Sequence, residues 1–371
     1  MSRHGVVAVL GAGAGGQAIA GLLALAGAEV RIWNRTAQRL VALREQQGVE
    51  LDGCVKGLAP LSLVTGDLRE AVEGAEVIMI VTPATAHEPV ARALAPALSA
   101  GQVVVLNPGR TGGALEVRQV VNEITSIPVA IAEAQTLLVA SRLVGPGRCR
   151  IFSVKRSVGL AAVPYEDTQS VVAVLSPLLP QFYPASSILE TSFDNMGAVF
   201  HPGVTLLNSA RIESPGNEFD YYHEGVTPGV ARVIEEIDNE RVLVAQRYGV
   251  KARTAQRWLE DAYGASGRSL HDAILRNTGY SGIRAPENLD TRYIWEDVPM
   301  SLVPISEFGR IAGVPTPTID GTISLCSAIH GIDYRSMGRT ASRMGIQGMS
   351  PEEVLEYART GTAEIDLVAN I

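Results

Sequence analysis

The sequence predicts an α/β domain followed by an all-α domain. With 371 residues, the chain is too long for one comfortable hydrophobic core, so two domains are the default expectation. In the first half, short β-branched segments alternate with helix-like segments, whereas from about Ser186 onward the pattern is mostly helical. Pro184 precedes this change. We therefore place the boundary near residue 185, which gives domains of residues 1–185 and 186–371.

The first half contains the succession of elements that a parallel sheet with helices on both faces requires. The predicted strands are residues 6–10, 29–33, 61–65, 76–82 and 102–106. Three further strand-like runs, at 129–132, 149–154 and 157–163, are expected to extend the same sheet. The predicted helices are an Ala/Leu-rich segment ending near residue 27, a polar segment at 36–47 and a segment at 167–179.

Composition and charge exclude several classes of protein. A formal net charge of −8 argues against a nucleic-acid partner, because binding phosphates needs a basic surface. The three cysteines are widely separated and have no zinc-binding spacing, so we expect no disulfide framework, no metal site and a reducing cytoplasm. No apolar run reaches the ~20 residues that cross a bilayer, and we expect neither a membrane partner nor a signal peptide.

A glycine-rich turn joins the first predicted strand to the first helix. The segment Gly11-Ala12-Gly13-Ala14-Gly15-Gly16 matches G-x-G-x-x-G. The first glycine allows a tight turn, the second lets the backbone approach a pyrophosphate, and the third brings helix and strand together. The helix N-terminus offers N–H groups to the anion. This context predicts a Rossmann dinucleotide-binding domain. The residues expected to contact the cofactor are Gly11, Gly13, Ala14 and Gly16. The alternative is a strand-to-helix turn that binds no ligand.

The end of the second strand discriminates between dinucleotides. An acidic residue there would bind the ribose 2′-hydroxyl and repel a 2′-phosphate. This chain has Asn34-Arg35-Thr36 instead. Arg35 can pair with a phosphate, while Asn34 and Thr36 can donate hydrogen bonds. We therefore predict that these three residues bind the cofactor. NADP(H) is the favoured dinucleotide, and NAD(H) stays open as the alternative.

Other candidate residues follow later strands, at the sheet edge where ligands bind. Thr82, Pro83 and Asn107 are predicted to contact the cofactor. Thr111 is predicted to donate to a substrate oxygen, and Glu133 to bind a cationic or amino group of the substrate. Ordinary loop chemistry is the alternative for Thr82, and hydrogen bonding within the cleft is the alternative for Glu133.

The second half offers a histidine, an arginine and an aspartate that together suit proton transfer on an acid substrate. His201 lies at the end of a helix-like stretch that leads to a proline, and a purely structural role is the alternative. Arg292 could grip a carboxylate with its two-pronged guanidinium group. Asp297 could hold a histidine in one tautomer, or form an internal salt bridge. Asn195 is a further candidate for the same cleft.

On these residues the chain resembles the octopine/nopaline (opine) dehydrogenase family, whose members depend on NAD or NADP. The resemblance covers nearly the whole chain and rests on the segments GAGAGG, NPGRTGGALE, DNMGAVFHP, HEGVTPGVARVIEEIDNER and RYIWEDVP. It implies condensation of an amino acid with a 2-oxo acid, often pyruvate, and reduction of the imine by NAD(P)H. It also implies that His201 acts as acid and base, that Asp297 supports it, and that Arg292 binds the substrate carboxylate.

Two other functions remain as alternatives. A 2-oxo acid reductase similar to ketopantoate reductases would be expected to use a lysine in the helical half, where Lys251 is the only one beyond residue 156. A non-catalytic dinucleotide sensor would keep the glycine loop without needing the histidine and its partners. The apolar helical half predicts a homodimer. The aromatic candidates for an amino-donor pocket are Tyr221, Tyr222, Trp258, Tyr280 and Trp295.

Overall fold

The computed structural model describes residues 4–216 and 218–362, which fold into two compact units. Unit 1 is Met1–Thr191 together with Glu356–Ile371, and unit 2 is Ser192–Leu355. The division at residue 191 lies slightly beyond the predicted boundary at 185. Nothing in the sequence pattern predicts that the segment 356–362 belongs to unit 1, where the Asn122 side chain donates to the carbonyl of Gly361 at 3.0 Å.

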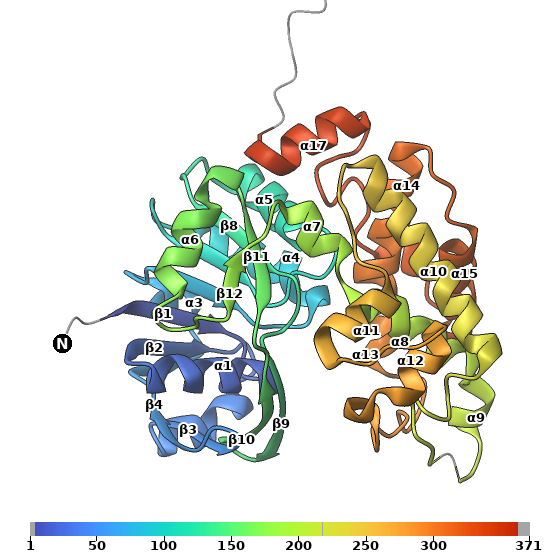
Figure 1. Ribbon diagram of the computed structural model, residues 1–371. Helices are drawn as coiled ribbons and strands as arrows, with labels where there is room; N and C mark the ends of the chain where they lie inside the picture. The colour runs from blue at the N-terminus through green and yellow to red at the C-terminus, as the bar shows by residue number, and fades with distance from the viewer. Residues whose placement is uncertain (1–3, 217, 363–371) are drawn as a thin grey trace, which may run out of the picture. The chain divides into compact units, whose positions relative to one another are not determined.

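The main sheet of unit 1 has eight strands in the order β12-β11-β8-β7-β6-β1-β2-β5 (Figure 1). The six strands from β8 to β5 pair in parallel, β11 is antiparallel to β8, and β12 is parallel to β11. The strands are β1 (His4–Leu10), β2 (Ala28–Trp33), β5 (Leu63–Thr65), β6 (Val77–Ile80), β7 (Val103–Leu106), β8 (Ala130–Ala134), β11 (Val158–Val163) and β12 (Phe182–Pro184). This arrangement confirms the predicted α/β domain.

Helices and short turns connect the strands of unit 1. They are α1 (Ala14–Leu25), η1 (Ala37–Leu40), α2 (Val41–Glu45), α3 (Leu68–Val72), η2 (Ala84–Ala86), α4 (His87–Leu94), η3 (Ala95–Ala97), α5 (Gly113–Ile124), η4 (Tyr165–Asp167), α6 (Thr168–Leu175) and α7 (Ile188–Phe193). Among them, α1, α3, α5 and α6 pack against the main sheet. Every residue of β6 is buried, as a strand covered on both faces requires. The predicted helix at 36–47 is instead the 3₁₀ turn η1 followed by the short α2.

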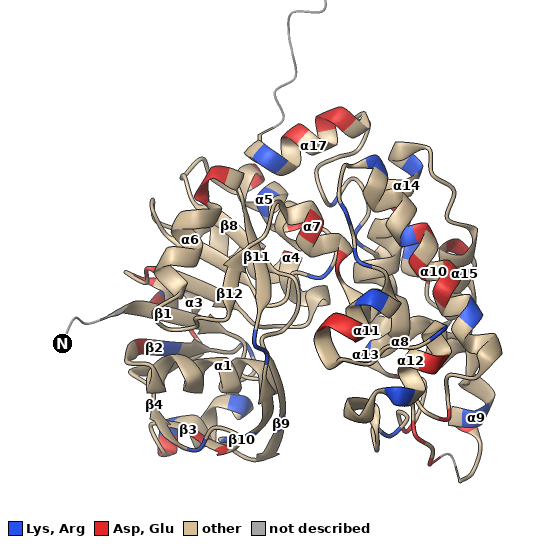
Figure 2. Cartoon of the chain, viewed as in Figure 1, with Lys and Arg blue, Asp and Glu red and all other residues tan. Residues whose placement is uncertain are grey.

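A second sheet of four strands corrects the sequence prediction for unit 1. Its order is β4-β3-β10-β9, with β3 (Gly48–Gly53), β4 (Gly57–Pro60), β9 (Val139–Gly145) and β10 (Arg148–Val154). The run at 149–154 therefore does not extend the main sheet. β3 and β10 carry charged residues between buried ones, whereas β6, β7 and β11 carry none (Figure 2). The second sheet thus buries one face against α1 and exposes the other.

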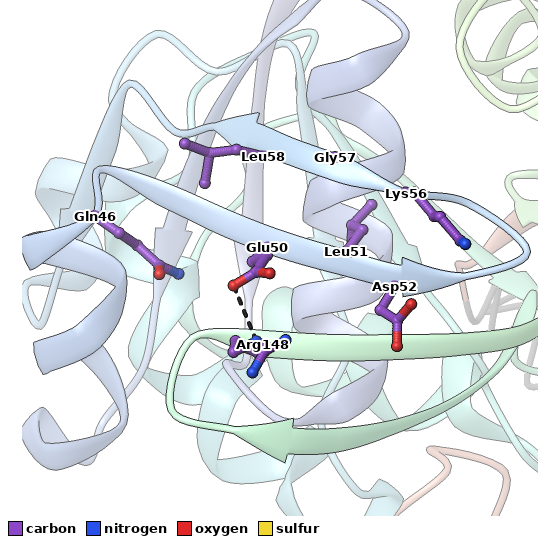
Figure 3. A pocket seen from close by; sticks show the side chains of 8 residues that line it. All are labelled: Gln46, Glu50, Leu51, Asp52, Lys56, Gly57, Leu58 and Arg148. Atoms are coloured by element: carbon purple, nitrogen blue, oxygen red, sulfur yellow. Dashed lines mark ion pairs between the residues drawn. The ribbon is translucent and has the colours of Figure 1, made fainter.

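The exposed side of the second sheet contains an open hollow of about 610 Å³ (Figure 3). An ion pair of 2.9 Å between Glu50 and Arg148 crosses it. It is lined by Gln46, Glu50, Leu51, Asp52, Lys56, Gly57, Leu58 and Arg148. None of the predicted site residues lines this hollow, so its chemistry is separate from that of the glycine loop.

Unit 2 is built from helices, and its described residues form no strand beyond one isolated bridge between Asp220 and Arg284. Its elements are α8 (Met196–Leu207), α9 (Ser209–Glu213), α10 (Pro228–Arg247), α11 (Ala255–Tyr263), α12 (Leu270–Arg276), η5 (Thr278–Tyr280), α13 (Arg292–Trp295), the π-helix η6 (Val298–Leu302), α14 (Val303–Ala312), α15 (Pro317–His330) and α16 (Tyr334–Met337). α17 (Pro351–Thr360) begins in unit 2 and ends in unit 1. The predicted all-α domain is confirmed. Across residues 4–216 and 218–362, no helix has the length and apolar character needed to span a bilayer.

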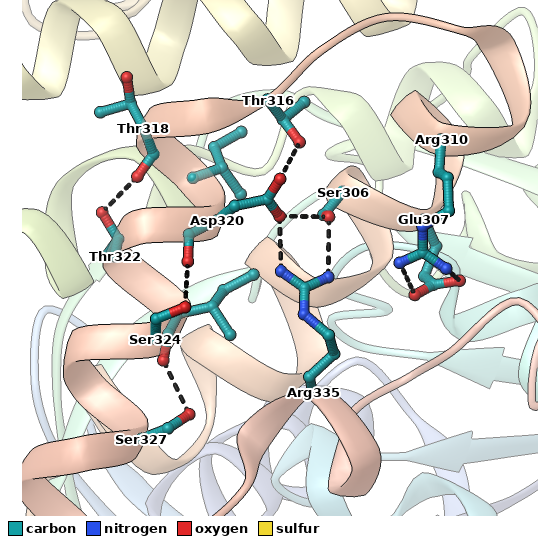
Figure 4. A network of polar contacts seen from close by, with 12 residues as sticks. Ser306, Glu307, Arg310, Thr316, Thr318, Asp320, Thr322, Ser324, Ser327 and Arg335 are labelled. Carbon is teal, nitrogen blue, oxygen red and sulfur yellow. Dashed lines mark hydrogen bonds and ion pairs between the residues drawn. The ribbon is translucent and has the colours of Figure 1, made fainter.

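Two polar networks connect the helices of unit 2. In the first, Asp320 on α15 accepts hydrogen bonds from Ser306 on α14 and from Arg335 on α16, each at 2.6 Å (Figure 4). In the second, the fully buried Arg241 on α10 pairs with Asp238 at 2.6 Å and donates to the carbonyl of Phe193. The second network therefore fixes the segment that leads into α8.

We predict that Asp238→Ala strongly destabilises unit 2. The substitution leaves the buried Arg241 guanidinium without its carboxylate, which typically costs about 3–5 kcal/mol. Glu260→Ala is the control, because Glu260 and its partner Arg257 form an exposed pair worth at most about 1 kcal/mol. Urea unfolding should show a much lower midpoint for Asp238→Ala, and equal midpoints for the two variants would contradict this account of the network.

Candidate active site

The glycine loop has the close backbone approach that a dinucleotide-binding turn requires. Gly11 has a φ of +121°, and a Cβ on it would lie 2.4 Å from the carbonyl oxygen of Val81. A Cβ on Gly16 would lie 1.8 Å from the carbonyl oxygen of Gly11. No side chain caps the N-terminus of α1 at Gly13, so the first N–H groups of this 12-residue helix stay available to an anion. The residues present therefore fit a pyrophosphate.

The structure assigns different tasks to the three residues after β2. Asn34 accepts a hydrogen bond from the Ala12 N–H at 3.0 Å and donates to the carbonyl of Thr36 at 3.1 Å, so it holds the glycine loop. The cofactor contact of Asn34 stays a prediction. Arg35 and Thr36 are exposed, and Arg35 forms no ion pair with a described residue. The Arg39 guanidinium lies 4.0 Å from the position of a Cβ on Gly13, so a second cation borders the loop.

Thr82 and Pro83 lie directly beyond β6, next to the glycine loop. The Thr82 methyl group is 3.2 Å from the position of a Cβ on Gly11. Within the described part of the chain, the Thr82 hydroxyl is buried and has no hydrogen-bond partner. Pro83 is exposed. A buried hydroxyl without a partner is costly, and a ligand held by the loop would satisfy it.

Two of the predicted ligand contacts, Asn107 and Glu133, also support the fold. Asn107 is fully buried and accepts a hydrogen bond from the Leu138 N–H at 3.2 Å. Glu133 is also fully buried, and its oxygens accept from the Ala114 N–H at 2.8 Å and from the Thr191 hydroxyl at 2.7 Å. The sequence does not reveal these internal hydrogen bonds. The contacts of Asn107 with the cofactor and of Glu133 with the substrate stay predictions.

Thr111 lies in the loop that Asn107 and Glu133 support. It is fully buried and directly precedes Gly112, the N-cap of α5. Gly109 in the same loop packs so closely on Glu133 that a Cβ would lie 2.5 Å from its side chain. The substrate contact of Thr111 stays a prediction.

In unit 2, the structure joins His201 to Asp297. His201 is in α8, directly before Pro202, and Asp297 is the N-cap of the π-helix η6. The His201 Nδ1 lies 2.9 Å from Asp297 Oδ2, and the aspartate side chain is fully buried. The histidine side chain keeps 17% of its surface exposed, and its Nε2 makes no hydrogen bond to a described residue. One nitrogen is thus anchored, and the other can exchange a proton with a reactant.

An aromatic residue that the sequence analysis missed fixes the plane of this imidazole. The Tyr293 ring stacks on His201 with centroids 4.2 Å apart and an angle of 25°. Behind it, the Tyr221 hydroxyl donates to the backbone carbonyl of His201 at 3.0 Å. Tyr293 lies between Arg292 and Asp297 in the sequence, and that proximity was the available signal. Arg292 itself is exposed at the first residue of α13.

The remaining unit 2 candidates belong to the support of His201. The Asn195 amide donates to the Ser301 hydroxyl at 2.8 Å, which joins the start of α8 to η6. The substrate contact of Asn195 stays a prediction. Tyr222 and Tyr280 stack with centroids 4.0 Å apart, and burial raises the pKa of both hydroxyls well above the ordinary value. Both rings belong to the core of unit 2, and a role of the aromatic candidates in an amino-donor pocket stays a prediction.

The comparisons with known proteins agree with this geometry. The model of the NAD/NADP octopine/nopaline dehydrogenase α-helical domain matches residues 184–330, and that of the NAD-dependent glycerol-3-phosphate dehydrogenase N-terminus matches residues 6–133. An opine dehydrogenase of Arthrobacter sp. (strain 1C) is 39% identical over 344 residues, covering 92% of this chain and 96% of the relative.

Solved structures show the same fold. Octopine dehydrogenase with NADH and L-arginine has a TM-score of 0.80 at 22% identity, covering 96% of this chain and 98% of that one. Yersinopine dehydrogenase with NADP⁺ has a TM-score of 0.74 at 16% identity, covering 97% of this chain and 99% of that one. From the matching domain models and the identity and coverage of the Arthrobacter relative, this chain belongs to the opine dehydrogenase family of NAD(P)-dependent oxidoreductases, which act on the CH–NH group of their donors.

Proposed function

We propose that this protein joins an amino acid to a 2-oxo acid such as pyruvate, with NADPH as the preferred reductant, and that it also catalyses the reverse oxidation. The observation that carries the proposal is the His201–Asp297 pair, with one imidazole nitrogen anchored on a buried carboxylate and the other available. The relatives support it, because curated proteins similar to this chain are named opine, octopine and tauropine dehydrogenases.

The proposed chemistry uses His201 as the group that holds and moves the proton. Its Nε2 takes a proton from the ammonium group of the amino acid, so that the amine can attack the oxo carbon. In the adduct, a proton passes from the attacking nitrogen to the former oxo oxygen. The same imidazole nitrogen then returns its proton to the resulting hydroxyl, which leaves as water and yields the protonated imine. The dinucleotide, when bound, would supply the hydride that reduces the carbon of this protonated imine to the secondary amine. Asp297 keeps Nδ1 as a donor, which leaves Nε2 for both proton transfers.

The site features disfavour the two alternatives. A reductase that depends on a lysine in its helical half has only Lys251 to use there, and this residue is exposed directly before α11. Burying a carboxylate costs free energy, and a dinucleotide sensor would have no use for a buried carboxylate that anchors a histidine. The pair therefore favours catalysis.

The proposal is tested by following NADPH oxidation with pyruvate and each amino acid in turn, then with other 2-oxo acids. We expect oxidation that requires both substrates. Oxidation with the oxo acid alone would favour the reductase alternative. NADPH binding without oxidation in any combination would favour the sensor.

We propose Arg35 as the main contact of the 2′-phosphate. It is exposed, is the second residue after β2, and has Arg39 nearby at the glycine loop. Arg35→Ala should raise the dissociation constant for NADPH about 10- to 100-fold, because a hydrogen bond to a charged group contributes ~1.5–3 kcal/mol. The constant for NADH should change less than about twofold, and the exposed Arg69→Ala should change neither. Fluorescence titration measures both constants, and equal losses for the two dinucleotides would contradict the assignment.

His201→Asn and Asp297→Asn should each lower kcat by about 10²-fold or more, because each disrupts the proton-transferring imidazole. The NADPH dissociation constant should stay the same, because the glycine loop and the residues after β2 are unchanged in both variants. His271→Asn on α12 is the control for loss of a histidine. Steady-state kinetics with saturating substrates measures the effect. A His201→Asn variant that keeps more than a tenth of the kcat would remove this residue from the mechanism.

Arg292→Met should raise KM for the 2-oxo acid about 10- to 100-fold, because a charge-assisted hydrogen bond to the carboxylate is lost. Arg292→Lys should recover only part of the loss, since an ammonium group cannot form the two-pronged contact. The exposed Arg276→Met serves as control. An unchanged KM in Arg292→Met would show that another cation orients the oxo acid.

We also propose that the protein is a cytoplasmic homodimer. The exposed apolar residues that support a dimer contact lie on α15 and just beyond it, namely Leu325, Ile329, Ile332 and Met337. Light scattering on the purified protein measures the mass in solution. A monomer at micromolar concentration would contradict the proposal.

A further inference from the structure

Lys155, directly after β10, is a titratable residue that the proposed mechanism does not use. Its ammonium group donates to the Thr136 hydroxyl and to the Leu137 carbonyl, each at 2.8 Å. Its backbone N–H also donates to the carbonyl of Leu138 at 2.9 Å. Three hydrogen bonds from one residue therefore hold the segment 136–138, which runs between β8 and β9.

The segment that Lys155 holds lies against the dinucleotide loop. The Leu137 side chain is 3.3 Å from the position of a Cβ on Gly15, in the first turn of α1. The next residue, Leu138, donates its N–H to Asn107 in the loop after β7. The segment thus extends from the anion-binding end of α1 to the loop after β7, and all of these contacts lie within unit 1.

The charge of Lys155 is easily lost. Burial of the ammonium group and repulsion by Arg110 lower the pKa of Lys155 to about 8. Arg110 lies in the loop after β7 and has a φ of +61°. Of the described segments next to Lys155, residues 135–138 and the start of β11 contain no ionisable side chain. The adjacent Arg156 is exposed to solvent. An anion bound at the nearby end of α1 would favour the ammonium form.

We propose that Lys155 is a positioning residue whose ammonium form holds the segment 136–138 against the glycine loop and strengthens dinucleotide binding. The proposal rests on the dinucleotide site in unit 1, and it is independent of which amino acid or oxo acid is used. Its failure is therefore distinguishable from failure of the proposed reaction, since the test reads binding rather than turnover.

The direction of the pH dependence follows from the charge. Lys155 is mostly protonated below a pH of about 8 and loses its charge as the pH rises through this value. Binding of the anionic dinucleotide raises the pKa of Lys155, so binding near pH 8 takes up protons. By linkage, the affinity for the dinucleotide is highest below pH 8 and falls above it. The total fall is tenfold for each unit by which dinucleotide binding raises the pKa of Lys155.

The first measurement is calorimetric titration with NADPH at pH 8 in two buffers of different ionisation enthalpy, which gives the number of protons taken up on binding. The second is the dissociation constant for NADPH, determined at pH 7 and at pH 9.5. We expect wild-type protein to take up protons and to lose about three- to tenfold in affinity between the two pH values. Lys155→Arg should keep its affinity at pH 9.5, because arginine stays charged. Lys155→Met should bind weakly at both pH values and show less proton uptake.

Thr136→Val provides a variant that keeps the charge. It removes a hydrogen bond that favours the ammonium form, so the fall in affinity should begin at a lower pH than in wild-type protein. Thermal unfolding checks that each variant is folded. The proposal is overturned if wild-type protein and Lys155→Arg show the same pH dependence and the same proton uptake, or if Thr136→Val leaves the midpoint unchanged.

Discussion

The contact between His201 and the buried Asp297 is the interaction on which the chemistry of unit 2 depends. A fully buried carboxylate is stable only when its oxygens have partners, so the fold must bring a donor to Asp297. The donor comes from α8, a helix that is 96 residues away in sequence from the aspartate. Asn195, bonded to Ser301, and Tyr221, bonded to the His201 carbonyl, hold α8 in the position this contact needs. The result is an imidazole with one anchored nitrogen and one available nitrogen.

Unit 1 contributes a second constraint, the close approach of α1 to β1. This approach is possible because Gly16 has no side chain, since a Cβ at this position would collide with the backbone of Gly11. Asn34 then ties the end of β2 to the same turn through the Ala12 N–H. Asn34 is occupied in this way, whereas the side chain of the next residue, Arg35, is exposed. The local structure therefore separates the residue that shapes the loop from an exposed cation beside it.

The fold and the chemistry-bearing motifs could be predicted from the sequence, because they depend on local patterns. The glycine turn after a β-branched strand is such a pattern, and the opine dehydrogenase segments around His201 and Asp297 are another. The buried supports could not be predicted. Asn107 directly follows β7 and Glu133 lies near the end of β8, and nothing local shows that their side chains turn inward. The run at 149–154 has the composition of a strand, but its sheet is decided by pairing with the distant strand β3 and with the adjoining strand β9. Tyr293 likewise needed the folded position of α13 against α8 before its ring could be placed.

The measurement that tests the central claim most directly follows the hydride itself. NADPH carrying deuterium at the transferable position of the nicotinamide is incubated with the protein, pyruvate and a mixture of amino acids, and the products are analysed by mass spectrometry. The account predicts deuterium on the carbon that joins the former oxo acid to the amino nitrogen of a secondary amine dicarboxylate. Deuterium in the 2-hydroxy acid, with no such amine formed, would contradict the account and show that the carbonyl rather than an imine is reduced.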